Sequence, residues 1–172
     1  MLTGVGAEVR EVRTPEQLDG LDGLVIPGGE STTMTIGIER EGLAEPLKRF
    51  AADGQPILAT CAGLILLDRD HLGILDIRSE RNAFGRQLHS FEADIEMLTI
   101  TEYGGPLRAV FIRAPWVTEV GPSVRVLAEV DGHVVAVEKG KILAVSFHPE
   151  ITGDDRLHQA LTDLASQGFR GV

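Results

Sequence analysis

The residue types best suited to covalent chemistry in this chain are one thiol, one imidazole and one carboxylate. Cys61 is the only cysteine, and it stands between the apolar run 57–60 and a Leu-rich stretch at 64–67. The first run has the length of a buried parallel strand and the second favours a helix, so we expect Cys61 at a strand-to-helix turn. At a helix N-terminus, free backbone N–H groups and the helix dipole favour a thiolate and can hold an oxyanion. The alternative is that Cys61 is a small buried hydrophobic residue, the commoner role of a single cysteine.

A candidate base and its orienting carboxylate occur together at the end of another apolar run. Residues 142–147 are followed directly by His148, Pro149 and Glu150. Residues two apart on an extended chain point the same way, so the carboxylate of Glu150 can reach the ring of His148. An imidazole can take up the proton of a thiol, and a carboxylate can fix its tautomer and stabilise its charge. A solvated turn is the alternative, but the ends of parallel strands are where α/β proteins build sites.

A third turn with special backbone requirements follows the apolar residues 24–26. Residues 27–33 read Pro-Gly-Gly-Glu-Ser-Thr-Thr. Two glycines allow positive φ angles and a close approach of a ligand to the backbone, and Ser31 or Thr32 can cap the helix that we expect next. The turn lacks the Lys of a phosphate-binding loop and the spacing of a dinucleotide fingerprint, so we reject nucleotide binding.

With these turns in place, the chain resembles the triad class of glutamine amidotransferases and, within it, the glutaminase subunits of pyridoxal phosphate synthases. The Cys61 turn and the His-Pro-Glu element are shared across the class. Two further segments indicate the vitamin B6 branch, Arg-Asn-Ala-Phe-Gly-Arg-Gln at 81–87 and Val-Phe-Ile-Arg-Ala-Pro at 110–115. The resemblance runs from about Gly6 to the C-terminal helix. It implies an α/β three-layer sandwich, with a mostly parallel central sheet and flanking helices, and a single glutaminase domain over residues 1–172.

The resemblance also implies a mechanism. Cys61 would attack the side-chain amide of L-glutamine, His148 would pass the thiol proton to the departing ammonia, and Glu150 would orient His148. Water would then release L-glutamate from the thioester. A guanidinium suits the α-carboxylate of an amino acid, and a carboxylate suits its ammonium group. The glutamine contacts carried over by the match are Gly29, Glu30, Ser31, Arg81, Ile112 and Arg113, and the oxyanion contacts are Gly29 and Ala62.

In the family that the chain resembles, ammonia passes to a barrel-type synthase subunit that builds pyridoxal 5'-phosphate. We therefore expect a hetero-oligomer in which this chain supplies only nitrogen. We expect no cofactor, because the sequence has no phosphate loop and no Lys in an obvious Schiff-base context. We expect no metal either, since the histidines lack metal-ligand spacing, and we interpret four of them as surface or hairpin residues: His71, His89, His133 and His158.

Composition argues against several other classes of protein. The 172 residues include 16 basic and 26 acidic side chains, and the resulting net charge of −10 disfavours nucleic acid or an anionic membrane as a partner. No apolar run approaches the roughly 20 residues of a membrane span, and no signal peptide is evident. One unpaired cysteine fits the reducing cytoplasm.

The hydrophobic pattern predicts an early alternation of strands and helices and a strand-rich second half. The Asp131-Gly132 pair between two alternating runs predicts a hairpin. Strands are expected at 7–12, 24–26, 57–60, 91–100, 109–113, 124–130, 133–138 and 142–147, and helices at 43–52 and 154–166.

One feature that the resemblance implies is absent. Members of the family normally begin with a strand, a Leu-Gln-Gly turn and a helix, and this sequence lacks them ahead of Met1. The strand lies in the middle of the family's sheet. We therefore expect the strands beside it to lack backbone partners and to expose apolar surface.

Two other functions stay open at this point. One alternative to a glutaminase is a different cysteine hydrolase of similar architecture, such as a peptidase or deglycase. The other is a silent binding subunit that cannot assemble its site without the first strand. The segments around Arg81 and Arg113 argue against the first alternative. Binding to a synthase without glutamine hydrolysis would support the second.

Overall fold

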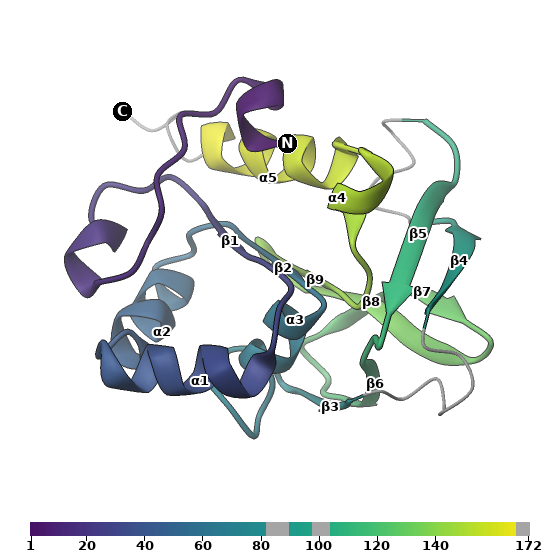
Figure 1. The fold of residues 1–172 in the computed structure, drawn as a ribbon, viewed down its shortest axis with the longest axis horizontal. Coiled ribbons are helices and arrows are strands. Elements are labelled where there is room, and N and C mark those ends of the chain that lie inside the picture. Colours follow the sequence, from purple (N-terminus) through teal and green to yellow (C-terminus); the bar gives the residue numbers. More distant parts are fainter. Residues whose placement is uncertain (82–89, 98–103, 168–172) are drawn as a thin grey trace.

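A mixed β-sheet lies between two groups of helices (Figure 1). The computed structural model describes residues 1–81, 90–97 and 104–167. Its strands are β1 (Leu24–Ile26), β2 (Ile57–Thr60), β3 (Ile77–Glu80), β4 (Ser90–Ile95), β5 (Leu107–Ile112), β6 (Trp116–Val120), β7 (Arg125–Val130), β8 (His133–Lys139) and β9 (Ile142–Val145). Its α-helices are α1 (Ser31–Arg40), α2 (Ala44–Ala52), α3 (Ala62–Leu67), α4 (Pro149–Thr152) and α5 (Arg156–Gln167), and two 3-10 turns, η1 (Leu2–Val5) and η2 (Pro15–Leu18), precede β1.

The parallel part of the sheet carries the three turns singled out in the sequence. The strand order is β1-β2-β9-β8-β6-β3, with β7 paired to β8, and β4 and β5 form a separate two-stranded sheet. β2 pairs in parallel with β1 on one side and with β9 on the other, whereas β8 runs antiparallel to β9. The carboxyl ends of β1, β2 and β9 therefore meet at one edge, which is where α/β folds build their sites.

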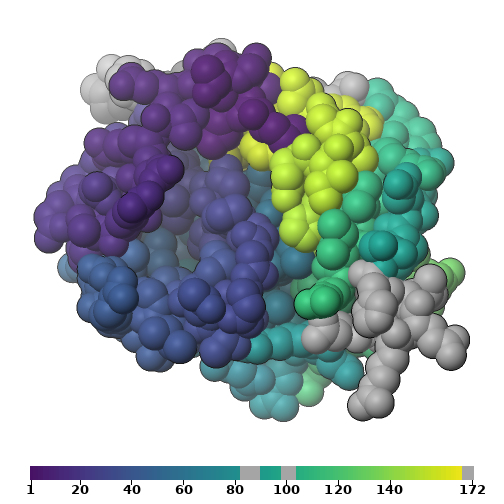
Figure 2. All heavy atoms as spheres, in the orientation of Figure 1, coloured from purple at the N-terminus to yellow at the C-terminus, as the bar shows by residue number. Residues whose placement is uncertain are grey.

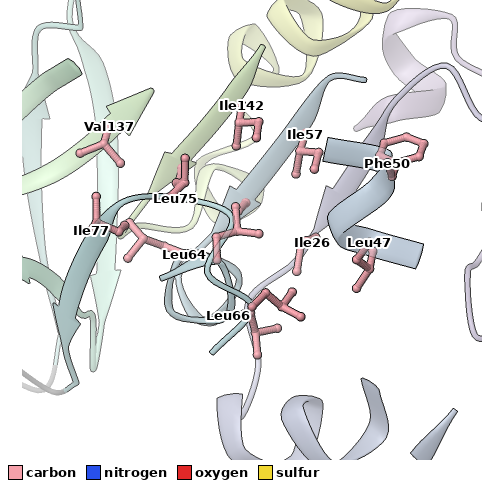
Figure 3. Packing of buried hydrophobic residues seen from close by; sticks show 14 of the residues in the cluster. Ile26, Leu47, Phe50, Ile57, Leu64, Leu66, Leu75, Ile77, Val137 and Ile142 are labelled. Atoms are coloured by element: carbon pink, nitrogen blue, oxygen red, sulfur yellow. The ribbon is translucent and has the colours of Figure 1, made fainter. Parts of the chain in front are cut away.

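Alternate residues of β2 show that the sheet is the middle layer of three. Ile57 and Ala59 belong to one buried cluster and Leu58 to another, because successive strand residues point to opposite faces. Leu47 and Phe50 of α2 join the first cluster beside Ile57 (Figure 3). Residues of α5 join the second. The predicted α/β fold with helices on both faces is confirmed.

The predicted strand at residues 7–12 is wrong. This segment is irregular and mostly exposed (Figure 2), with Val9 51% exposed. The physical reason is the lack of a ladder partner, because no described strand pairs with the outer edge of β1. An apolar groove of about 860 Å³ lies between the segment and Ile26, Met34 and Leu47. The outer edge of β1 therefore has no described strand partner, and an apolar groove lies beside it.

Most other predicted elements are present with shifted ends. α2 is confirmed, and the β7–β8 hairpin turns at Asp131 and Gly132, whose φ angles are 51° and 77°. The strand predicted at 91–100 is β4, which ends at Ile95. Residues 98–100 of the predicted range lie outside the described part of the chain. β3 and β6 were not predicted. Among the described helices, none is long and apolar enough to cross a membrane.

Candidate active site

Cys61 lies at the turn between β2 and α3, as the sequence predicts. Its φ angle of 50° is unusual for a residue other than glycine, and such conformations cluster at functional sites. The amide of Cys61 donates a hydrogen bond of 2.8 Å to the carbonyl of Val145, which ties the turn to β9. Gly63 allows α3 to pack closely against β1, since a Cβ at this position would strike the carbonyl oxygen of Ile26. Neighbouring strands thus hold the thiol at the edge of the sheet.

His148 and Glu150 make the predicted contact, although on a different backbone from the one expected. Nδ1 of His148 lies 2.6 Å from Oε1 of Glu150. His148 is the N-cap of the short helix α4, so the chain turns into a helix here and is not extended. The amide of His148 donates a 2.9 Å hydrogen bond to the carbonyl of Val110 in β5. The imidazole is thus placed by β9, α4 and β5 together.

The surroundings of His148 favour its charged form. A hydrogen bond with Cys61, and next the hydrogen bond with Glu150, raise the pKa of His148 to about 9, while partial burial opposes the rise. At neutral pH the ring is therefore an imidazolium beside the sulfur of Cys61. A positive charge in that position stabilises an anionic sulfur, which is the form that attacks a carbonyl carbon.

The Gly-Gly turn after β1 passes beside both residues. A Cβ added to Gly28 would lie 2.5 Å from Cε1 of His148 and 3.4 Å from Cβ of Cys61. Only glycine fits there without displacing the imidazole. The structure therefore brings together the three turns that the sequence marked separately.

Glu30, and not Ser31 or Thr32, caps α1. Its Oε2 accepts hydrogen bonds from the amide (2.7 Å) and hydroxyl (2.9 Å) of Thr33, and its Oε1 accepts one from the amide of Thr32 (3.2 Å). These bonds, that of the Thr33 amide above all, lower the pKa of Glu30 to about 2. The carboxylate is therefore charged at any ordinary pH. Ser31, the first residue of the helix, is buried.

The remaining predicted glutamine contacts come from two other elements. Arg81 follows β3, and its Nη1 donates to Oγ1 of Thr32 over 3.0 Å, which places the guanidinium beside the first turn of α1. Ile112 ends β5 only two residues beyond the carbonyl that holds His148, and it is 40% exposed. Arg113 comes next, with a φ angle of 45°. Residues 82–87 of the predicted Arg-Asn-Ala-Phe-Gly-Arg-Gln segment lie outside the described residues.

Two histidines were misinterpreted from the sequence. His158 is buried in α5 and not at the surface. The side chain of His71 is only 19% exposed, and it contacts both Asp68 and Arg81. The spacing of three residues between Asp68 and His71, directly after a predicted helix, was the available signal for the first of these contacts.

The fold is that of an α/β protein. The thiol and the His–carboxylate pair at the ends of neighbouring parallel strands form a site of the kind that cysteine hydrolases use. Residues 1–164 match the SNO glutamine amidotransferase family, and the chain belongs to that family. It is 53% identical over 169 residues to the pyridoxal 5'-phosphate synthase subunit PdxT of Geobacillus thermodenitrificans (strain NG80-2), which covers 94% of this chain and 85% of that protein. The same subunit of Shouchella clausii (strain KSM-K16) is 49% identical over 174 residues, or 97% of this chain and 88% of its own.

Solved structures agree with the family. A crystal structure described as a glutamine amidotransferase is 42% identical and superposes with a TM-score of 0.87 over 96% of this chain and 90% of its own. The structure of PurLQS from Thermotoga maritima is 19% identical, with a TM-score of 0.64 over 85% of this chain and 81% of that one. The second likeness concerns the fold alone.

Proposed function

We propose that this chain hydrolyses L-glutamine to L-glutamate and ammonia, and that it passes the ammonia to a synthase that makes pyridoxal 5'-phosphate. The observation that carries the proposal is the convergence of Cys61, His148 and Glu150 at the edge of the parallel strands, where a Cβ on Gly28 would meet both the imidazole and Cys61. The names of the PdxT relatives, at about half identity over nearly the whole chain, support the same reaction.

The reaction starts at the contact between Cys61 and His148, where the imidazolium stabilises the sulfur as the attacking thiolate. The sulfur attacks the side-chain amide carbon of glutamine, and the backbone N–H groups of Ala62 and Gly29 hold the developing oxyanion. The imidazolium of His148 gives its proton to the departing ammonia, which leaves a thioester on Cys61. The neutral ring then takes a proton from the attacking water, and glutamate leaves as the sulfur regains its negative charge. Glu150 keeps the ring in one orientation throughout.

Substrate selection rests on charges around the nucleophile. Arg81 and Arg113 bind the α-carboxylate of glutamine, since a guanidinium matches a carboxylate in charge and geometry. Glu30 binds the ammonium group, because its capping bonds keep it ionised and each oxygen has further acceptor capacity. Ser31 supplies a contact at the start of α1, and Ile112 offers an exposed apolar surface for the methylene groups.

The partner that we propose is a barrel-type synthase subunit. Ammonia released into water is diluted and protonated, so a glutaminase that feeds a synthesis works best when docked to the enzyme that consumes the ammonia. The assignment of a barrel follows the family resemblance. We place the complex in the cytoplasm, where the catalytic thiol stays reduced.

One observation favours the silent-subunit alternative. β1 has no described strand on its outer side, and Pro27 and Gly28 follow directly from that strand. His148 nevertheless contacts Glu150, and its ring and Cys61 both lie beside Gly28. The assembled site therefore supports catalysis over silence.

Substitution of Cys61 separates the two halves of the proposed reaction. In complex with the synthase, Cys61→Ala abolishes pyridoxal 5'-phosphate formation from glutamine but leaves formation from added ammonium salts intact. Loss of both activities in a folded complex would overturn the division of labour. Retention of the glutamine-dependent activity would overturn the role of Cys61.

A further inference from the structure

A buried carboxylate that the proposed reaction does not use lies at the end of α3. The side chain of Asp68 is 2% exposed. Its Oδ1 faces Nδ1 of His71 at 2.7 Å and accepts from the amide of Asp70 at 3.0 Å, while its Oδ2 accepts from the hydroxyl of Ser79 at 2.5 Å. Both oxygens are occupied, so the carboxylate is a fixed acceptor for His71.

The contact with Asp68 sets the tautomer of His71. Because Oδ1 of Asp68 accepts from Nδ1 of the ring, Nε2 is the nitrogen left to act as an acceptor. That nitrogen lies 3.4 Å from Nη2 of Arg81, which can only donate. The direction of donation is therefore fixed along the line, from Arg81 to His71 and from His71 to Asp68.

Arg81 is held at two points. Its Nη1 donates to the hydroxyl of Thr32 in the first turn of α1, and its Nη2 faces His71 in the loop between α3 and β3. These contacts take two of the five N–H donors of the guanidinium and leave enough for a bidentate carboxylate. A long and flexible side chain is thus fixed beside the Gly-Gly turn before any substrate arrives.

We propose that His71, oriented by Asp68, is a positioning residue that holds the guanidinium of Arg81 ready for the α-carboxylate of glutamine. The inference rests on the proposed function, because it needs Arg81 to bind that carboxylate. It assigns a role to a pair of residues that lies outside the Cys61, His148 and Glu150 site. Preorganisation of this kind strengthens binding of the substrate and does not change the chemical step.

Two substitutions separate the two sides of the ring. In His71→Asn the short amide still reaches Asp68 but cannot accept from Arg81, whereas in His71→Gln the longer side chain places its amide oxygen near the position of Nε2. In the complex with the synthase, we expect His71→Asn to raise KM for glutamine about tenfold with kcat within about twofold, as for one lost bond to a charged group. His71→Gln restores most of the loss, and Asp70→Asn, a neighbour with a 60% exposed side chain, is the control without effect.

A double-mutant cycle with Arg81→Ala distinguishes the possible failures. Arg81→Ala should raise KM, and adding His71→Asn to it should raise KM no further. If Arg81→Ala leaves KM unchanged, Arg81 does not bind the substrate, and the inference about His71 is overturned with it. Suppose instead that Arg81→Ala raises KM. The positioning role alone is then overturned if His71→Asn by itself leaves KM unchanged, or if it raises KM by the same factor in the double variant as in the wild type. 4-Aminobutanamide, which is glutamine without the α-carboxylate, should react equally with wild type and His71→Asn. A loss of activity toward this compound as well as toward glutamine would contradict the positioning role and indicate a damaged fold.

Discussion

Gly28 and His148 lie so close that a single methyl group would not fit between them. A Cβ on Gly28 would come within 2.5 Å of Cε1 of the imidazole. The imidazole cannot retreat freely, because Glu150 holds its Nδ1 and Val110 holds its backbone amide. The turn after β1 therefore fixes one side of the catalytic base.

Substituting Gly28 tests this packing. We predict that Gly28→Ala lowers kcat for glutamine hydrolysis by about 10²-fold, because a displacement of about 1 Å costs roughly that much in a positioned reaction. Gly37→Ala in α1 is the matched control, since its added Cβ would meet no atom within 4 Å beyond its chain neighbours and the backbone of its own helix. It should keep full activity and gain about 0.5–1 kcal/mol of stability. Activity is measured as glutamate release in the complex. Unchanged activity in Gly28→Ala would contradict the close contact.

The charge of His148 can be followed directly by NMR titration of its ring. The folded-state pKa of about 9 lies above the ordinary value of 6.5. The stability gained from the imidazolium is therefore complete below pH 6.5 and is lost as the pH rises through about 9. Because the bond with Cys61 is the largest cause, Cys61→Ala should lower the midpoint. A wild-type midpoint near 6.5 would show that Cys61 and Glu150 do not stabilise the charged ring.

Glu150→Gln keeps the shape of the side chain but removes its charge. We expect kcat to fall by about 10²–10⁴-fold, because the ring loses both its orientation and the stabilisation of its charged form. The pKa of His148 should fall as well, since the hydrogen bond and the charge of Glu150 both raise it. The KM for glutamine should change little. A normal kcat would show that Glu150 does not act on His148.

Glu30 ties the stability of α1 to pH. With a pKa of about 2 in place of 4.5, its contribution is complete above pH 4.5 and is lost as the pH falls through about 2. Glu30→Gln should therefore lower the urea midpoint at pH 7, and the difference from wild type should shrink below pH 4.5. Glu39→Gln, at an exposed position of the same helix, is the control. An equal effect of the two changes would argue against a specific cap.

Arg113 needs a substitution that respects its backbone. Its φ angle of 45° is tolerated better by Asn than by Ala, so Arg113→Asn removes the charge with little added strain. We expect KM for glutamine to rise about 10- to 100-fold with kcat nearly unchanged, from the loss of one or two bonds to a carboxylate. An unaltered KM would remove Arg113 from the substrate site.

The sequence was most informative where burial is complete. Runs such as Ile57–Thr60 and Ile142–Val145 are buried throughout, so their continuous apolar pattern identifies central strands. The turns at the ends of those strands then followed, and with them the placement of Cys61 and His148. Asp131 and Gly132 predicted their hairpin because few other residues accept two successive positive φ angles.

The remaining features depend on partners that a local pattern does not reveal. Alternation at residues 7–12 suits a strand, but a strand also needs a neighbour, and no described strand lies beside it. Glu30 caps α1 although Ser and Thr are the preferred capping residues, because its longer side chain folds back onto the amides of Thr32 and Thr33. His71 meets Arg81 only because the chain after α3 returns along β3.

Glutamate release from L-glutamine by the purified chain tests the central claim most directly. The chain is assayed alone and with a barrel-type synthase, and Cys61→Ala serves as the blank. We predict that wild type releases glutamate in the presence of the synthase and that the variant releases none, while both remain folded by circular dichroism. Equal glutamate release by wild type and Cys61→Ala, or none from a folded wild-type complex, would contradict the assignment of a Cys61-dependent glutaminase.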